Sequence, residues 1–79
     1  MTESKPKSVV IFYSTSGAIK TESLAKKQGL IVKLIPVPRH LSSDCGICLS
    51  FNSGDLHRIE RILRENKIEF DAIYELKNN

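Results

Sequence analysis

The 79-residue chain carries a formal charge of +3, two cysteines and no tryptophan. A chain of this length forms one small domain with little room for an enclosed active site. Its Lys and Arg residues are scattered among acids, unlike the dense patch of a nucleic-acid-binding protein. No apolar run approaches the ~20 residues that cross a bilayer, and no segment has the pattern of a signal peptide. The composition therefore favours a small cytoplasmic protein.

The first half of the chain predicts a strand and a helix. Residues 1–7 are polar and predict a loose tail ahead of a single domain at residues 8–79. Residues 8–13 are β-branched and aromatic, which predicts a central strand that is apolar on both faces. Ser14, Thr15 and Ser16 offer N-caps for a helix from about residue 17 to residue 28, and Gly29 suits the position after its end.

The middle of the chain predicts two strands joined by a turn. Residues 30–35 form the second strand, and the Pro-rich and Ser-rich stretch that follows reads as a turn. Residues 47–51 alternate as a third strand, with Ile47, Leu49 and Phe51 on one face and Cys48 and Ser50 on the other.

The last third of the chain predicts a helix and a strand. Ser53 is the expected N-cap of the second helix, whose buried stripe is Leu56, Ile59, Ile62 and Leu63. On its exposed side, the spacing favours the ion pairs Glu60–Arg64 and Arg61–Glu65. Residues 68–76 alternate with period two and predict the final strand.

The element order β-α-β-β-α-β predicts an α+β, ferredoxin-like two-layer sandwich with a four-stranded antiparallel sheet. In that topology the turn after the first strand and the turn between the second and third strands share one edge of the sheet. Cys45 would then lie near the amides of Ser14, Thr15 and Ser16. A helix N-terminus favours a thiolate, and Arg39 in the same turn adds positive charge.

The sequence Cys45-Gly46-Ile47-Cys48 leaves several interpretations open. A redox dithiol needs a helix after the first cysteine, whereas strand residues three apart lie roughly 10 Å from each other. A structural zinc site needs four ligands, and only His40 and His57 supplement the thiols. The remaining interpretations are one nucleophilic Cys45 with Cys48 as a buried apolar residue, or two inert thiols.

The chain resembles the family catalogued as DUF3343, whose members are called selenium/sulfur carrier-like proteins. The resemblance rests mainly on Lys33-Leu34-Ile35-Pro36-Val37-Pro38-Arg39 and Leu41-Ser42-Ser43-Asp44-Cys45-Gly46, followed by Leu49 and Phe51. It implies that Cys45 carries sulfur or selenium as a persulfide or selenyl sulfide. Ser50 departs from the family pattern, which has an arginine at this position.

We therefore expect a sulfur/selenium carrier rather than a stand-alone enzyme. Cys45 is its expected nucleophile, and the expected binding residues are Arg39, Gly46, Ser14, Thr15 and Ser16. We expect donor and acceptor proteins as partners, no metal, no cofactor and no membrane; nucleic acid is not favoured, and a homodimer is allowed. The alternative is a non-catalytic module: an RNA-binding sheet that uses Phe12, Tyr13 and Phe51, or a regulatory subunit that pairs sheet to sheet.

Overall fold

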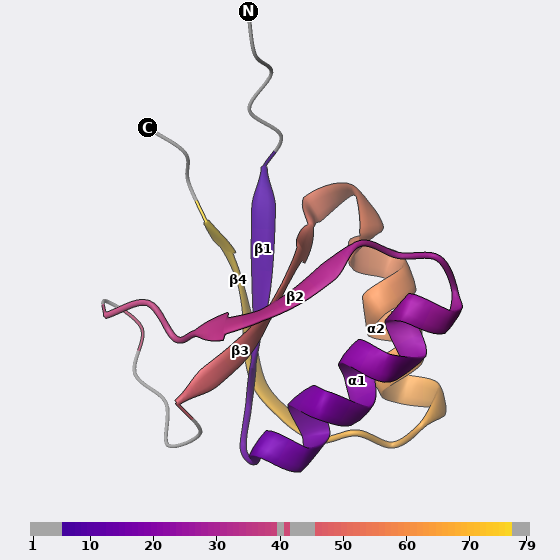
Figure 1. The fold of residues 1–79 in the computed structure, drawn as a ribbon, viewed down its shortest axis with the longest axis horizontal. Coiled ribbons are helices and arrows are strands. Elements are labelled where there is room, and N and C mark those ends of the chain that lie inside the picture. The colour runs from indigo at the N-terminus through magenta and orange to yellow at the C-terminus, as the bar shows by residue number, and fades with distance from the viewer. Residues whose placement is uncertain (1–5, 40, 42–45, 77–79) are drawn as a thin grey trace, which may run out of the picture.

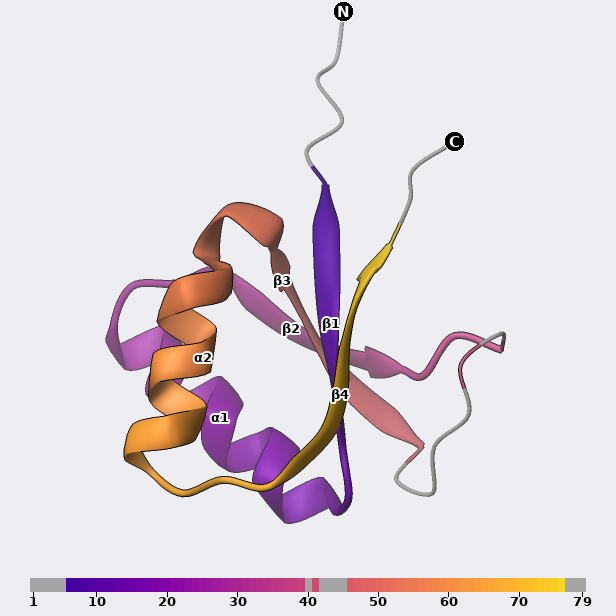
Figure 2. The same cartoon turned by 180° about the vertical axis from the view of Figure 1, so that it is seen from behind.

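Within the residues that this computed structural model describes, 6–39, 41 and 46–76, four strands and two α-helices form the fold. In chain order the elements are β1 (Lys7–Phe12), α1 (Thr15–Lys27), β2 (Val32–Pro36), β3 (Ile47–Asn52), the short 3₁₀ helix η1 (Ser53–Asp55), α2 (Leu56–Glu65) and β4 (Phe70–Leu76). The strands form one antiparallel sheet in the order β2-β3-β1-β4, and both α-helices pack on the same face of it (Figures 1 and 2). The predicted α+β fold with a four-stranded antiparallel sheet is confirmed.

Local capping sets the limits of α1. The helix begins earlier than the apolar pattern predicts, because the Ser14 Oγ accepts a hydrogen bond from the Gly17 N–H at 3.5 Å and makes Ser14 the N-cap. The helix ends, as predicted, just before Gly29, which has a φ of +81°. The Leu30 N–H then donates to the carbonyl oxygen of Ala25 at 3.0 Å, which closes the last turn.

The prediction that Ser53 caps α2 is wrong. Ser53 lies in η1, and its Oγ is 2.6 Å from the Oγ of Ser8 on β1. The antiparallel pairing of β1 with β3 brings these two distant serines together, and the Ser53 N–H also donates to the carbonyl oxygen of Pro6. Asp55 takes the N-cap position of α2 without a side-chain hydrogen bond.

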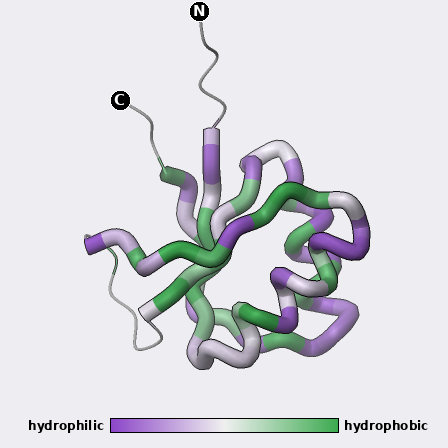
Figure 3. Tube along the Cα trace, in the orientation of Figure 1, coloured by the Kyte–Doolittle hydropathy of each residue, from purple (hydrophilic) through white to green (hydrophobic). Residues whose placement is uncertain are grey.

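The main core lies between the sheet and the helices. The stripe predicted for α2 is confirmed, since Ile59, Ile62 and Leu63 are buried and Leu56 packs against them. Burying an apolar side chain of this size stabilises the fold by about 1.5–3 kcal/mol. Figure 3 shows apolar segments along the strands, where they cross in the middle of the molecule, and hydrophilic segments on the outer turns of the helices. In the described ranges, neither helix has the length and hydropathy of a membrane span.

The chain also covers the opposite face of its own sheet. Val9 and Ile11 of β1 and Cys48 of β3 point to this face, and all three are 0% exposed. Val37 and Leu41, which follow β2, pack against them together with the strand residues Ile35 and Leu76. Part of the apolar second face, which suggested a sheet-to-sheet dimer, is therefore covered within a single chain.

Candidate functional site

The candidate site is the hairpin connection, residues 37–46, which joins β2 to β3. The Val37 N–H donates to the carbonyl oxygen of Gly46 at 3.2 Å, and this bond extends the β2–β3 ladder into the connection. The Leu41 N–H donates to the carbonyl oxygen of Pro38 at 2.9 Å. Cys45, with His40 and residues 42–44, lies outside the described residues. Hydrogen bonds therefore hold described residues both before and after the predicted nucleophile in the sequence.

Gly46 turns the chain directly before β3. Its φ is +84°, in the left-handed region that side chains with a Cβ disfavour. The residue is exposed, and a Cβ added there would meet no atom within 4 Å. The backbone conformation alone therefore requires glycine next to Cys45.

The strand register places the hairpin connection at the sheet end where α1 begins. Pro36 pairs with Ile47 and Ile11 pairs with Cys48, so the C-terminal ends of β1 and β2 meet the start of β3. This is the shared end of the sheet on which the sequence argument for the site depended.

The described residues of the two turns nevertheless lie on different faces of the sheet. Val37 and Leu41 pack on the face without helices, and Figures 1 and 2 show β2 and β3 extending away from both helices toward the connection. The start of α1 instead borders the segment between α2 and β4, where residues 66–69 complete a hollow of about 320 Å³ with Ser14 and Ser16. The structure therefore does not bring Arg39 and Gly46 onto the hollow at the start of α1; a contact between Cys45 and the amides there stays a prediction.

The predicted binding groups differ in their local partners. The Ser14 Oγ caps Gly17 and lies 3.1 Å from the Ser16 Oγ, so the first turn of α1 already meets part of its own hydrogen-bonding need. Thr15 is exposed at the start of the helix. Arg39 is exposed, and among the described residues no carboxylate oxygen lies within 4.0 Å of it. Within the described part of the connection, Arg39 is therefore an exposed positive charge that an incoming anion can approach.

Cys48 is a packing residue in this structure. It is 0% exposed within the cluster formed with Val9 and Ile11, and its Sγ–H points to the carbonyl oxygen of Pro36 at 4.0 Å. Cys48 lies in β3, whereas the second cysteine of a thioredoxin-type dithiol lies in a helix. His57 is exposed on α2, on the other side of the sheet, so it does not join Cys48 in a metal site.

The aromatic residues of the central strands are unavailable for base stacking. Phe12 and Phe51 are each 1% exposed and belong to the core under the helices. Tyr13 is 60% exposed, but it follows β1 and borders the hollow at the start of α1. Phe12 and Phe51 therefore do not offer the stacking surface that the RNA-binding alternative assigned to them.

Sequence reasoning missed Val37 and Leu41 as residues that hold the connection. Both are apolar side chains inside a stretch read only as a polar turn, four residues apart. Two apolar residues four positions apart, directly after a strand of a sheet with a second apolar face, were the sequence signal for this packing. The apolar residues show that the connection packs on the sheet and does not project freely at this point.

Comparison with protein-family models matches residues 7–75 to a family described as "Putative Se/S carrier protein-like". No curated protein and no solved structure matches the chain. The match spans every element from β1 to β4 and includes the whole hairpin connection.

Proposed function

We propose, on the premise that this chain belongs to the family described as Putative Se/S carrier protein-like, that it carries sulfur or selenium on the side chain of Cys45. In this proposal the protein is a carrier in the cytoplasm, where thiols stay reduced, and it works between a donor protein and an acceptor protein. The family match across the hairpin connection is the observation that carries the proposal. The element order and the sheet order β2-β3-β1-β4 also support our assignment of the fold to the ferredoxin-like class.

The loading step is a thiol exchange that needs no cofactor. The Cys45 thiolate attacks the terminal sulfur of a donor persulfide, and a new S–S bond forms. The S–S bond of the donor breaks, and the donor leaves as a thiolate. Delivery reverses these roles, with the acceptor nucleophile attacking the outer sulfur, so no external oxidant or reductant enters.

Residues of the connection support this chemistry. The exposed Gly46 has no side chain that would hinder approach to its neighbour, and the exposed Arg39 is suited to stabilise an anionic persulfide. The Val37–Gly46 hydrogen bond joins the two described ends of the connection. The amides and hydroxyls of Ser14, Thr15 and Ser16 remain proposed contacts of the loaded chalcogen at the same end of the sheet.

The first experiment measures loading by intact mass. The Cys48→Ala variant keeps Cys45 as its single thiol, and Cys45→Ser is the matched control that keeps Cys48. After incubation with glutathione persulfide, we expect a gain of one sulfur atom on the Cys48→Ala protein, removed by dithiothreitol, and no gain on the control. Selenodiglutathione replaces the persulfide in a parallel arm, and it separates selenium from sulfur loading.

A second measurement tests whether the fold activates the thiol. An unfolded peptide of residues 41–51 with the same Cys48→Ala change is the reference for intrinsic reactivity. At neutral pH we expect iodoacetamide to alkylate Cys45 faster in the folded protein than in the peptide. Equal rates together with no chalcogen gain would assign Cys45 to inert packing and overturn the proposal.

A further inference from the structure

The layer of helices carries the positive charge of the molecule. The two helices contain Lys20, Lys26, Lys27, Arg58, Arg61 and Arg64 against Glu22, Glu60 and Glu65, and the segment after α2 adds Lys67 and Glu69. Six cations against three acids give the helices a charge of +3, as large as the formal charge of the whole chain. With Lys67, seven of the twelve Lys and Arg residues of the chain belong to this layer.

Most cations of this layer have no acidic partner. The three glutamates of the helices are already engaged: Glu22 lies 3.3 Å from Lys26, Glu65 lies 3.2 Å from Arg61, and Glu60 lies 3.9 Å from the Nδ1 of His57. The predicted Glu60–Arg64 pair does not form. In the described chain, five of its cations have no carboxylate oxygen within 4.0 Å, and we call them the basic face: Lys20, Lys27, Arg58, Arg64 and Lys67.

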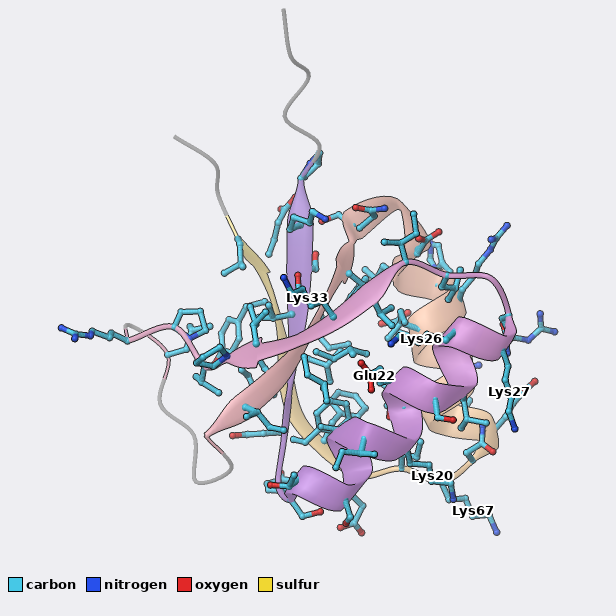
Figure 4. The ribbon with its side chains drawn as sticks, viewed as in Figure 1. Lys20, Glu22, Lys26, Lys27, Lys33 and Lys67 are labelled. Carbon is cyan, nitrogen blue, oxygen red and sulfur yellow. The ribbon has the colours of Figure 1, made fainter. Side chains whose placement is uncertain are left out.

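The basic face is laid out over two helices. Lys20 and Lys27 are seven residues apart on α1, about 10 Å along the helix axis, and Ser23 between them is also exposed. Lys20 and Lys67 line the hollow of about 320 Å³ together, with Glu69 at its border. Figure 4 shows Lys20 and Lys67 close together where α1 begins and Lys27 farther along the same side, whereas Lys26 turns toward Glu22.

We propose that the basic face is a docking surface for an acidic patch on a partner protein. The assignment of that partner as the donor or the acceptor rests on the proposed carrier function. Carboxylates spaced about 10 Å apart, as at positions i and i+7 of a helix, would match Lys20 and Lys27. Complementary charge raises the rate of encounter, which suits a carrier that meets its partners briefly.

The chemistry of the face favours a protein over a nucleic acid. The glutamates between its cations oppose a continuous phosphate backbone, and single-stranded nucleic acids require successive aromatic stacking surfaces. In the described chain, Tyr13 is the one exposed aromatic residue that borders the face. Val37 and Leu41 pack on the face of the sheet without helices, so a partner on the basic face would not cover these described residues of the connection.

The test compares two charge reversals of equal size. Lys20→Glu/Lys67→Glu removes charge from the basic face, and Lys7→Glu/Lys33→Glu removes the same charge from exposed positions on β1 and β2. The probe is a fluorescein-labelled helical peptide with glutamates at i, i+4 and i+7, followed by anisotropy at low salt. We expect the first variant to raise the Kd at least about tenfold and the second to change it less than about twofold.

Equal weakening of peptide binding by both charge reversals would show that only the net charge of the protein matters, and this would overturn the proposal. Tighter binding of single-stranded RNA than of the peptide, through the same lysines, would replace it by a nucleic-acid surface. If the charge-reversal variant fails to fold, Lys20→Gln/Lys67→Gln replaces it. We expect this variant to lose less affinity for the peptide, because it removes the positive charges without adding negative ones. Sulfur loading from glutathione persulfide is measured in parallel on the Cys48→Ala protein, so no loading together with intact peptide binding would refute the carrier function alone.

Discussion

Two turns of this fold depend on single residues whose backbone conformation strongly favours glycine. Gly29 and Gly46 both have φ above +80°, and each stands between a regular element and a change of chain direction. Neither is crowded, because a Cβ at either position would meet no atom within 4 Å. Their requirement for glycine is therefore conformational and not steric.

Replacement of Gly46 by alanine isolates that conformational cost. We expect Gly46→Ala to lower the free energy of unfolding by about 1–2 kcal/mol, because alanine disfavours the left-handed region. Gly54→Ala is the matched control, since Gly54 is exposed, has no positive φ and has no neighbour within 4 Å of an added Cβ. Urea denaturation of both variants gives the difference, and an equal stability of the two would contradict the assigned turn.

Two serines illustrate how a pair of residues joins distant elements. Ser8 is 4% exposed on β1, and its hydroxyl contacts that of Ser53 in η1 across 45 positions of sequence. A double-mutant cycle with Ser8→Ala and Ser53→Ala should yield a coupling of about 0.5–1.5 kcal/mol in urea unfolding. Strictly additive losses would show that the contact does not stabilise the fold.

At the scale of elements, the hairpin connection acts as a cover on the helix-free face of the sheet. Val37 and Leu41 shield Val9, Ile11 and Cys48, although the cover comes from a turn and not from a helix or a strand. Val37 and Leu41 belong to the same segment of sequence as Cys45, the predicted nucleophile.

Truncation of the cover should expose the buried thiol. In a Cys45→Ser background, we expect Leu41→Ala to lower the unfolding free energy by about 1–2 kcal/mol, less than for a fully buried leucine because Leu41 is half-buried. The rate at which Cys48 is alkylated under native conditions should rise at the same time, because local opening becomes easier. Ile31→Ala, at a position 72% exposed, is the control and should change neither value measurably.

The alkylation rate of Cys48 can also contradict the role assigned to Leu41. If Cys48 in the Leu41→Ala protein reacts only as fast as global unfolding permits, the connection does not open independently. The role assigned to Leu41 as a local cover would then be wrong.

Across the whole molecule, six of the twelve Lys and Arg residues lie on the two helices, and Lys67 follows α2. The ion pairs in the described chain are exposed and separated by three or four residues, and such pairs each contribute little. The five cations of the basic face repel one another, and salt screens that repulsion. We therefore expect added NaCl up to about 0.3 M to raise the melting temperature slightly, by screening over a Debye length of under 10 Å. A steady fall of the melting temperature with added NaCl would mean that attractive ion pairs outweigh this repulsion.

Local patterns predicted most of the elements. Ser14 was one of three N-cap candidates, and α1 begins earlier than predicted. Apolar periodicity identified the buried stripe of α2 and the two faces of β3, and Gly29 was correctly placed after α1. These predictions succeeded because the interactions lie within a few residues of one another. The Ser53 prediction failed because a strand neighbour 45 residues away captured the hydroxyl that local rules assign to the helix.

The candidate site was predicted in part. Topology correctly placed the hairpin connection at the sheet end where α1 begins, since strand direction follows from element order. It did not indicate that Val37 and Leu41 pack on the face opposite the helices, because side-chain burial depends on how the twisted strands cross. The convergence of Cys45 with the start of α1 stays a prediction.

The sequence by itself determined the element order, the glycine turns and the family to which the chain belongs, because each depends on short spacings or residue identity. Only the tertiary structure decided which face the connection covers, which serines meet and which lysines are left without acids. Those outcomes depend on the register and packing of segments far apart in the chain, which bring together charges and apolar groups that no local pattern links.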